Sequence, residues 1–200
     1  MPKPHIVAEA RLPAVLSFTA GPDPDLTISL RLVDAQTPIT IAKDAQLQVF
    51  MATNAVLIRE AASQQNIALP TLDVNMKSAP PLRLVPEEAV AAKSRFVTLE
   101  PGVSCDILRV PFRPQGATRK SVEGARAETA RDGFLFAQLG MHLLEPGREY
   151  TVQVKSGVRI SSWMEGRVED LIQEGPGEWR PRPDAINVLP AEGFRFRVED

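Results

Sequence analysis

The side chains best suited to covalent chemistry in this sequence are one thiol and two imidazoles. Cys105 is the only cysteine, and His5 and His142 are the only histidines. A thiol beside an imidazole can act as a nucleophile with its general base, and Cys105 with His142 is the pair of the right types. Cys105 alternates with Val103 and Ile107, however, which favours a buried core thiol on one strand face. We expect His142 on an ordinary strand and His5 in a mobile N-terminal tail, and therefore predict no catalytic residues.

Acidic side chains offer a second kind of chemistry, and their spacing favours structural roles. Asp23, Asp25 and Asp34 carry the carboxylates that calcium prefers, but interleaved prolines and the lack of EF-hand spacing favour solvated turns. Glu87-Glu88 and Glu169-Asp170 are more typical of helix-end charges than of paired acid and base catalysts. The sequence has no glycine-rich phosphate loop and no nucleophile elbow. We predict no metal site and no cofactor.

Tryptophan and arginine form the most interesting candidate binding surface. Trp179-Arg180-Pro181-Arg182-Pro183 combines residue types favoured at interfaces with an extended, stiff backbone. Trp163, Arg159 and Arg167 are candidates to line a concave site with Trp179, where guanidinium groups would select an anionic or aromatic ligand. The segment after Trp179 is more typical of a connector that packs Trp179 against the core of the domain before the last strand.

Pro114–Asp132 is polar and basic-leaning, and we expect it to be a mobile insertion. Arg119-Lys120-Ser121 within it resembles a basophilic kinase site, where a phosphate would add charge to the segment. Short matches of this type are common, so the sequence leaves modification of Ser121 open.

Length and composition limit the classes of protein that fit. Two hundred residues suit one elaborated domain with a core that needs neither disulfide nor metal, and we expect residues 1–200 to form a single domain. A formal charge of −2 removes the broad positive field typical of nucleic-acid binding, although a local basic patch remains compatible with it. No apolar run reaches the roughly 20 residues of a membrane helix. The single cysteine favours a reducing compartment, so we expect a cytoplasmic or nuclear protein.

The elements that must position these residues are mostly strands. Alternating apolar and polar residues are clearest at Leu26–Leu32, and 18 prolines with 12 glycines supply many turns. Two short helices are expected, at Pro86–Lys93 and Met164–Gln173. The main predicted strands are Leu12–Phe18, Leu26–Leu32, Thr37–Ile41, Gln46–Met51, Asn54–Arg59, Thr71–Val74, Leu82–Val85, Arg95–Leu99, Val103–Val110, Tyr150–Val154 and Phe194–Val198. The fold class is therefore all-β.

The only tyrosine, Tyr150, stands in the most specific motif of the chain. Leu144-Glu145-Pro146-Gly147 leads into a strand in which Val152 and Val154 follow Tyr150 at period two. The same tetrapeptide recurs at Leu99–Gly102, which indicates a repeated turn rather than a duplicated domain. The run at Tyr150 resembles the tyrosine corner of immunoglobulin and fibronectin-III domains, where the hydroxyl bonds to upstream backbone. The resemblance implies an antiparallel immunoglobulin-like β-sandwich with extra strands, in which Pro146, Gly147 and Tyr150 have structural roles.

A second resemblance rests on the overall layout. The clean early strand, the two Leu-Glu-Pro-Gly turns and the Trp163 to Gly166 segment resemble uncharacterised small proteins of filamentous fungi. This resemblance implies no activity, and a sandwich fold by itself does not select a function.

From these features we expect a non-catalytic intracellular module that binds or scaffolds a protein partner through sheet edges and loops. The alternative is a small-molecule-binding protein or an atypical enzyme with a cavity near Trp163 and Trp179. Self-association through exposed strand edges is a third option. We expect no membrane partner and no nucleic acid.

Overall fold

The protein is described by a computed structural model that covers residues 3–17, 24–43, 55–67, 82–86, 95–112, 144–174 and 177–199. Strands make up 54% of the structure, so the predicted all-β class is confirmed. The expected insertion at 114–132, the helix predicted at 86–93 beyond its first residue, and the strands predicted at 46–51 and 71–74 lie outside the described residues.

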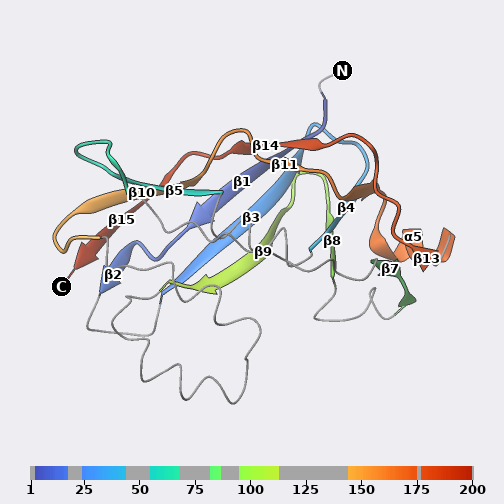
Figure 1. The fold of residues 1–200 in the computed structure, drawn as a ribbon, viewed down its shortest axis with the longest axis horizontal. Coiled ribbons are helices and arrows are strands. Elements are labelled where there is room, and N and C mark those ends of the chain that lie inside the picture. The colour runs from blue at the N-terminus through green and yellow to red at the C-terminus, as the bar shows by residue number, and fades with distance from the viewer. Residues whose placement is uncertain are drawn as a thin grey trace, which may run out of the picture.

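Two five-stranded sheets dominate the structure (Figure 1). The first sheet has the order β11 (Arg159–Ile160), β14 (Ile186–Pro190), β1 (His5–Arg11), β3 (Asp25–Val33) and β9 (Ser104–Pro111). The second sheet has the order β2 (Val15–Ser17), β15 (Phe194–Glu199), β10 (Glu149–Val154), β5 (Val56–Glu60) and β6 (Asn66–Ile67). Buried side chains of both sheets belong to one core cluster, because period-two alternation turns one face of each strand inward.

Two strand pairs depart from the expected antiparallel pairing. β1 pairs with β14 in parallel, and β15 pairs with β2 in parallel. Each of these pairs joins strands from opposite ends of the chain, so no tight hairpin dictates an antiparallel direction.

Strands β1 and β14 were also missed by the sequence analysis. His5 is the first residue of β1 rather than part of a mobile tail, and its Nδ1 lies 3.6 Å from the carboxylate of Asp34. In β1 the inward positions Ile6, Ala8 and Ala10 are small or medium-sized, so their hydrophobic alternation is weak. β1 is stabilised by pairing with β3 on one side and β14 on the other, and these partners are not visible in its own sequence pattern.

The two Leu-Glu-Pro-Gly segments adopt the same turn, as predicted. Gly102 and Gly147 have φ values of 77° and 80°, and the N–H three residues after each glutamate donates to that glutamate's carbonyl, at 3.2 and 3.3 Å. Proline followed by a residue with positive φ is the pattern of a type II turn, which glycine accommodates without strain. After the second turn, the buried hydroxyl of Tyr150 accepts a hydrogen bond of 2.8 Å from the Glu145 N–H.

A bulge in β9 changes the expected environment of the cysteine. The register between β3 and β9 shifts so that Ile107 has no partner, which turns both Ile107 and Leu108 toward the core. Val103 is 56% exposed, and Cys105 is half-buried against the edge of the core. The prediction that Val103, Cys105 and Ile107 share one buried face was therefore wrong.

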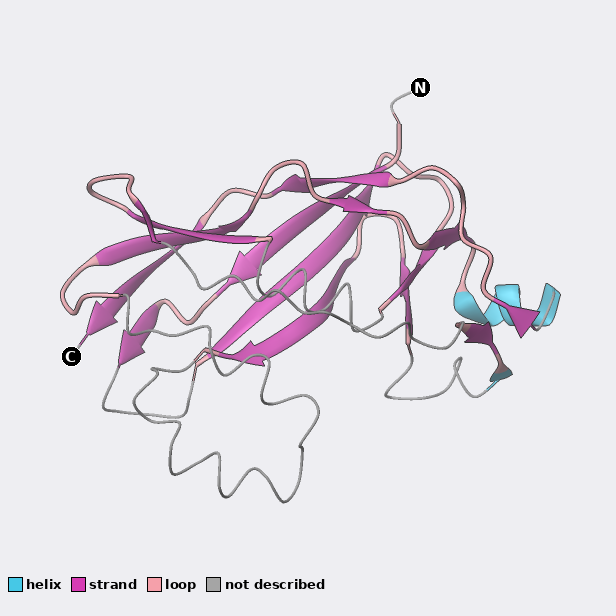
Figure 2. Ribbon diagram, viewed as in Figure 1, coloured by secondary structure: helices cyan, strands magenta, loops and turns pink. Residues whose placement is uncertain are grey.

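A smaller assembly extends from one end of the two large sheets (Figure 2). It contains the sheet β12 (Trp163–Glu165), β4 (Ile39–Ala42) and β8 (Phe96–Leu99), the pair β13 (Gly177–Glu178) and β7 (Arg83–Leu84), and helix α5 (Val168–Glu174). The helix is shorter than the predicted Met164–Gln173, because Met164 lies in β12 and Gly166, with a φ of 109°, separates strand from helix. A second core cluster packs α5 against β4, β7 and β8.

Two hydroxyls connect this sheet to the start of α5. The fully buried Thr40 donates to the Gly166 carbonyl at 2.8 Å, and the Val168 N–H donates to Thr98 Oγ1 at 3.1 Å. The two hydroxyls lie 3.1 Å apart. Because Thr40 gives its only hydroxyl proton to Gly166, Thr98 must donate to Thr40. Thr98 thus satisfies one of the free N–H groups at the helix N-terminus.

Substituting Thr98→Val is expected to destabilise the protein by about 1–3 kcal/mol, because it leaves the Val168 N–H and a lone pair of Thr40 unsatisfied at similar side-chain volume. Urea unfolding of the variant measures the loss. Thr98→Ser keeps the hydroxyl and serves as the matched control. Equal stability of the valine and serine variants would contradict a capping role for Thr98.

Candidate functional site

Trp179, one of the predicted binding residues, is a core residue. Its side chain is only 8% exposed and belongs to the second core cluster. The indole packs against Phe96 with 4.6 Å between ring centroids, and its Nε1 donates to Ser162 Oγ at 2.8 Å. The side chain therefore has little surface left for a ligand, as the alternative interpretation of a packed connector proposed.

Trp163 is partly exposed but is held by its neighbours. Its Nε1 donates to the Asp184 carbonyl at 2.7 Å, and the Arg182 guanidinium lies 5.6 Å from the ring centroid. Arg182 also forms an ion pair with Glu165, whose other oxygen accepts from Thr37 at 2.8 Å. A guanidinium over an indole is a favourable cation–π arrangement. In this protein the contacts of Arg182 with Trp163 and Glu165 hold the segment after Trp179 against β12.

Arg167 is also engaged within the protein. Its guanidinium contacts Glu100 in a bidentate pair, with Nε to Oε1 at 2.6 Å and Nη2 to Oε2 at 3.2 Å. The hydrogen bond from Arg167 holds the pKa of Glu100 below its usual value, and the same contact raises the pKa of Arg167. Both side chains reach solvent, which screens the pair and limits its contribution to stability.

The remaining predicted residues do not join the tryptophans in a concave site. Arg159 is exposed on β11 of the first sheet, opposite Asn187, and Arg180 is exposed just after β13. Neither arginine forms an ion pair with a described residue. The structure brings Trp163, Arg182 and Trp179 near β12 through internal contacts, and it leaves Arg159 and Arg180 free at separate places.

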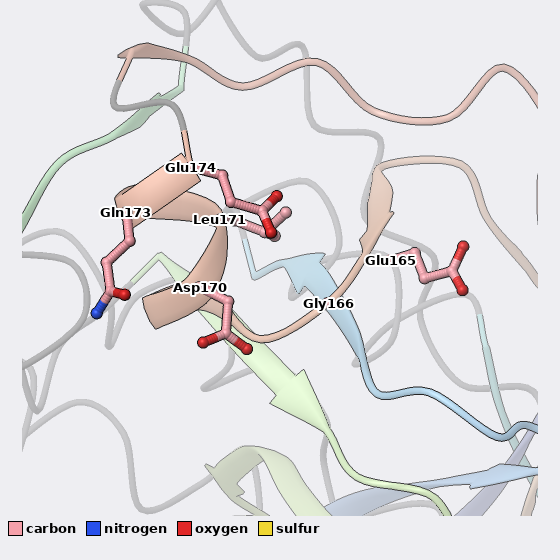
Figure 3. Close-up of a pocket in the computed structure, with 6 residues that line it drawn as sticks. All are labelled: Glu165, Gly166, Asp170, Leu171, Gln173 and Glu174. Carbon is pink, nitrogen blue, oxygen red and sulfur yellow. The ribbon is translucent and has the colours of Figure 1, made fainter.

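Neither of two hollows in the described surface is lined by a tryptophan. One, of about 340 Å³, is lined by Glu165, Gly166, Asp170, Leu171, Gln173 and Glu174. Figure 3 shows Asp170, Gln173 and Glu174 on α5, while Glu165 comes from the end of β12. The acidic residues of the first turn, Glu169 and Asp170, are helix-end charges, as predicted. Among the described residues, no group of three or more potential ligands is arranged to hold a metal ion.

The second hollow, of about 450 Å³, lies over β1, β3 and β9 and is polar. Arg11 and Arg109 line it together with Asp25 and Asp106, so its charges balance. Ser29 donates to Asp106 at 2.6 Å on its floor. Because positive and negative side chains already lie next to one another there, the hollow prefers neither an anionic nor a cationic ligand.

Cys105 and the candidate aspartates do not form a reactive centre within the described part of the chain. Burial raises the pKa of the Cys105 thiol, which keeps it protonated and poorly nucleophilic at neutral pH. His142 and Asp23 lie outside the described residues. Asp25 begins β3 and Asp34 follows its end, so the length of the strand separates these two carboxylates.

A positively charged face on the second sheet was missed by the sequence analysis. Arg195 on β15, Thr151 on β10 and Arg59 on β5 are in register on three neighbouring strands. Their backbones alternate with the buried residues of the same strands, so the three side chains share the outer face. We call these three residues the arginine row. The alternation in Phe194–Val198 predicts that Arg195 and Arg197 face solvent. The sequence therefore indicates Arg195, one of the two arginines of the row, but not Arg59.

The arginine row has few contacts with the other described residues. Arg59 Nε donates to Asn66 Oδ1 at 3.0 Å, and neither Arg59 nor Arg195 forms an ion pair with a described residue. A Cβ on Gly193 would lie 2.3 Å from Thr151 Cγ2, so glycine is needed where the chain enters β15 beside the row. Within the described ranges, the row is thus a pair of guanidiniums without an acidic partner and with a hydroxyl between them.

Comparisons with protein-family models, curated proteins and solved structures found no match to this chain. The fold and the site together define a mostly-β protein with a local cationic face. The one helix of the described ranges is α5, which has seven residues and is too short to cross a membrane.

Proposed function

We propose that this protein is a non-catalytic immunoglobulin-like β-sandwich that binds a protein partner through the outer face of its second sheet. The observation that carries the proposal is the arginine row, Arg195, Thr151 and Arg59, because its guanidiniums have no acidic partner among the described residues. Arginine is favoured at protein interfaces, where it forms charge-assisted hydrogen bonds with a partner.

The order of the strands supports the immunoglobulin-like assignment. In this proposal we assign β1, β3 and β9 to strands A, B and E, and β15, β10, β5 and β6 to G, F, C and C′. Tyr150 then stands near the start of strand F, with its hydroxyl bonded to backbone five residues upstream, as in a tyrosine corner. The elements between β10 and β15 are an insertion relative to that pattern.

Trp163, Trp179, Arg167 and Arg182 are less suited to recognise a partner, and the exposed Arg159 and Arg180 lie apart from one another rather than side by side. Trp179 is a core residue, and the exposed groups of Arg167 and Arg182 are engaged by Glu100 and Glu165. A small-molecule or atypical enzyme function at Trp163 and Trp179 has no specific observation in its favour. We therefore propose binding at the arginine row, on the outer face of the second sheet.

Affinity capture from a lysate of the source organism tests this proposal. The double variant Arg59→Ala/Arg195→Ala is expected to lose a protein that the wild type retains in stoichiometric amount. The matched control is Arg159→Ala/Arg180→Ala, which removes two exposed arginines elsewhere and is expected to retain the partner. Circular dichroism and urea unfolding verify that both double variants are folded.

Mass spectrometry of proteins and of solvent-extracted small molecules decides between the alternatives. Equal retention of the partner by both double variants would overturn the assignment of the face. A retained metabolite with no protein partner would replace the binding-module function with the small-molecule alternative.

A further inference from the structure

We infer that the arginine row binds a carboxylate-rich, extended segment of the partner protein. The inference rests on the proposed function and adds the chemistry of the partner. The register Arg195–Thr151–Arg59 places one guanidinium on each side of the Thr151 hydroxyl. Adjacent strands lie about 4.8 Å apart, so the two arginine Cα atoms are separated by about 10 Å.

That spacing suits carboxylates. An arginine side chain is long and flexible, so both guanidiniums can lean toward a carboxylate placed above Thr151, and the hydroxyl donates a further hydrogen bond. The bond from Arg59 Nε to Asn66 leaves the two terminal nitrogens of that guanidinium for the ligand. The row therefore presents several donors and no acidic acceptor.

The neighbouring rows of the sheet determine how the segment lies. On one side, Gln153 and Leu57 are in register and neutral. On the other, Arg197 stands between Glu149 on β10 and the half-exposed Val15 on β2. Glu60 and Glu145, near this end, both contact Arg148, and Glu199 follows at the end of β15. The acid nearest to the arginine row is Glu149, which lies two residues before Thr151 on the same face of β10 and opposite Arg197.

The side chains of the face favour a peptide over a nucleic acid. Neither of the two hollows described above lies on this face. The described outward side chains of the three central strands include no aromatic residue that would stack a base, and the chain carries a net charge of −2. An extended peptide that lies across the sheet also reaches the apolar atoms of Val15 and Leu57.

A labelled peptide of alternating glutamate and serine tests the inference directly, with a glutamine and serine peptide as its matched control. The wild-type protein is expected to bind the glutamate peptide, to bind it more weakly as ionic strength rises, and not to bind the glutamine peptide. Arg59→Ala and Arg195→Ala are each expected to weaken binding roughly fivefold, the scale of a solvent-exposed ion pair. Arg180→Ala is expected to leave binding unchanged.

Other results would overturn the inference. Equal binding of the glutamine peptide would remove the role of charge, and equal loss in Arg180→Ala would remove the role of the arginine row. Tighter, row-dependent binding of a single-stranded oligonucleotide would identify phosphate polymers as the ligand instead. If the peptide fails to bind but the captured partner still depends on Arg59 and Arg195, the acidic-segment inference fails while the proposed function stands.

Discussion

Replacing Trp179 by alanine is expected to lower the free energy of unfolding by about 3–5 kcal/mol, the largest single effect outside the main core. The indole fills the second core cluster, contacts Phe96 at 4.6 Å between centroids and uses its Nε1 to satisfy Ser162. Removing it creates a cavity beneath α5 and leaves the partly buried Ser162 hydroxyl without its donor. Urea unfolding followed by fluorescence and circular dichroism measures the change.

Trp179→Phe is the matched variant for this prediction. It keeps an aromatic ring against Phe96 and loses only the hydrogen bond to Ser162 and part of the ring volume, so a cost of about 1–2 kcal/mol is expected. The folded phenylalanine variant is expected to retain the captured partner in full. An alanine variant as stable as the wild type that no longer retained the partner would return Trp179 to the binding surface.

Substitution of Tyr150 by alanine is expected to cost a similar amount, about 3–5 kcal/mol, because the side chain is 2% exposed at the centre of the main core. Its ring stacks on Phe196 of β15 with 5.6 Å between centroids. Its hydroxyl accepts from the Glu145 N–H, which joins the start of β10 to the preceding turn. Thermal and urea unfolding of the variant provide the test.

Tyr150→Phe separates the hydroxyl from the ring. It retains the stacking on Phe196 and leaves one turn N–H to water, so a loss of about 1 kcal/mol is expected. A phenylalanine variant with wild-type stability would show that the hydroxyl contributes nothing, and the tyrosine-corner assignment would lose its energetic basis. A loss equal to that of the alanine variant would show that the hydrogen bond, not the packing, positions β10.

Several elements were predictable because their signals are local. Leu26–Leu32 alternates strictly, and it forms the buried centre of β3. The two Leu-Glu-Pro-Gly segments make the same turn, because proline and glycine restrict the backbone angles of their own positions. The charges of Glu169 and Asp170 fall in the first turn of α5 for the same local reason.

Other elements depend on partners that are distant in the sequence. β14 pairs with β1 across the whole chain, and β2 pairs with β15 in the same way. The bulge at Ile107 exists only as a mismatch between β9 and β3, so the pattern of β9 by itself misplaced Val103 and Cys105. The short β12 was taken as the start of a helix, because its pairing with β4 is a tertiary contact.

For the candidate site, the sequence determined which residue types are available, and the tertiary structure decided which of them are free. Nothing local distinguishes Arg167 and Arg182, which meet Glu100 and Glu165, from Arg59 and Arg195, which meet no acid among the described residues. The distinction arises because strand register places side chains from distant parts of the chain about 5 Å apart or on separate faces. The sequence by itself determined a β-rich chain with defined turns and a buried tyrosine, whereas the cationic face exists only once β15, β10 and β5 are aligned.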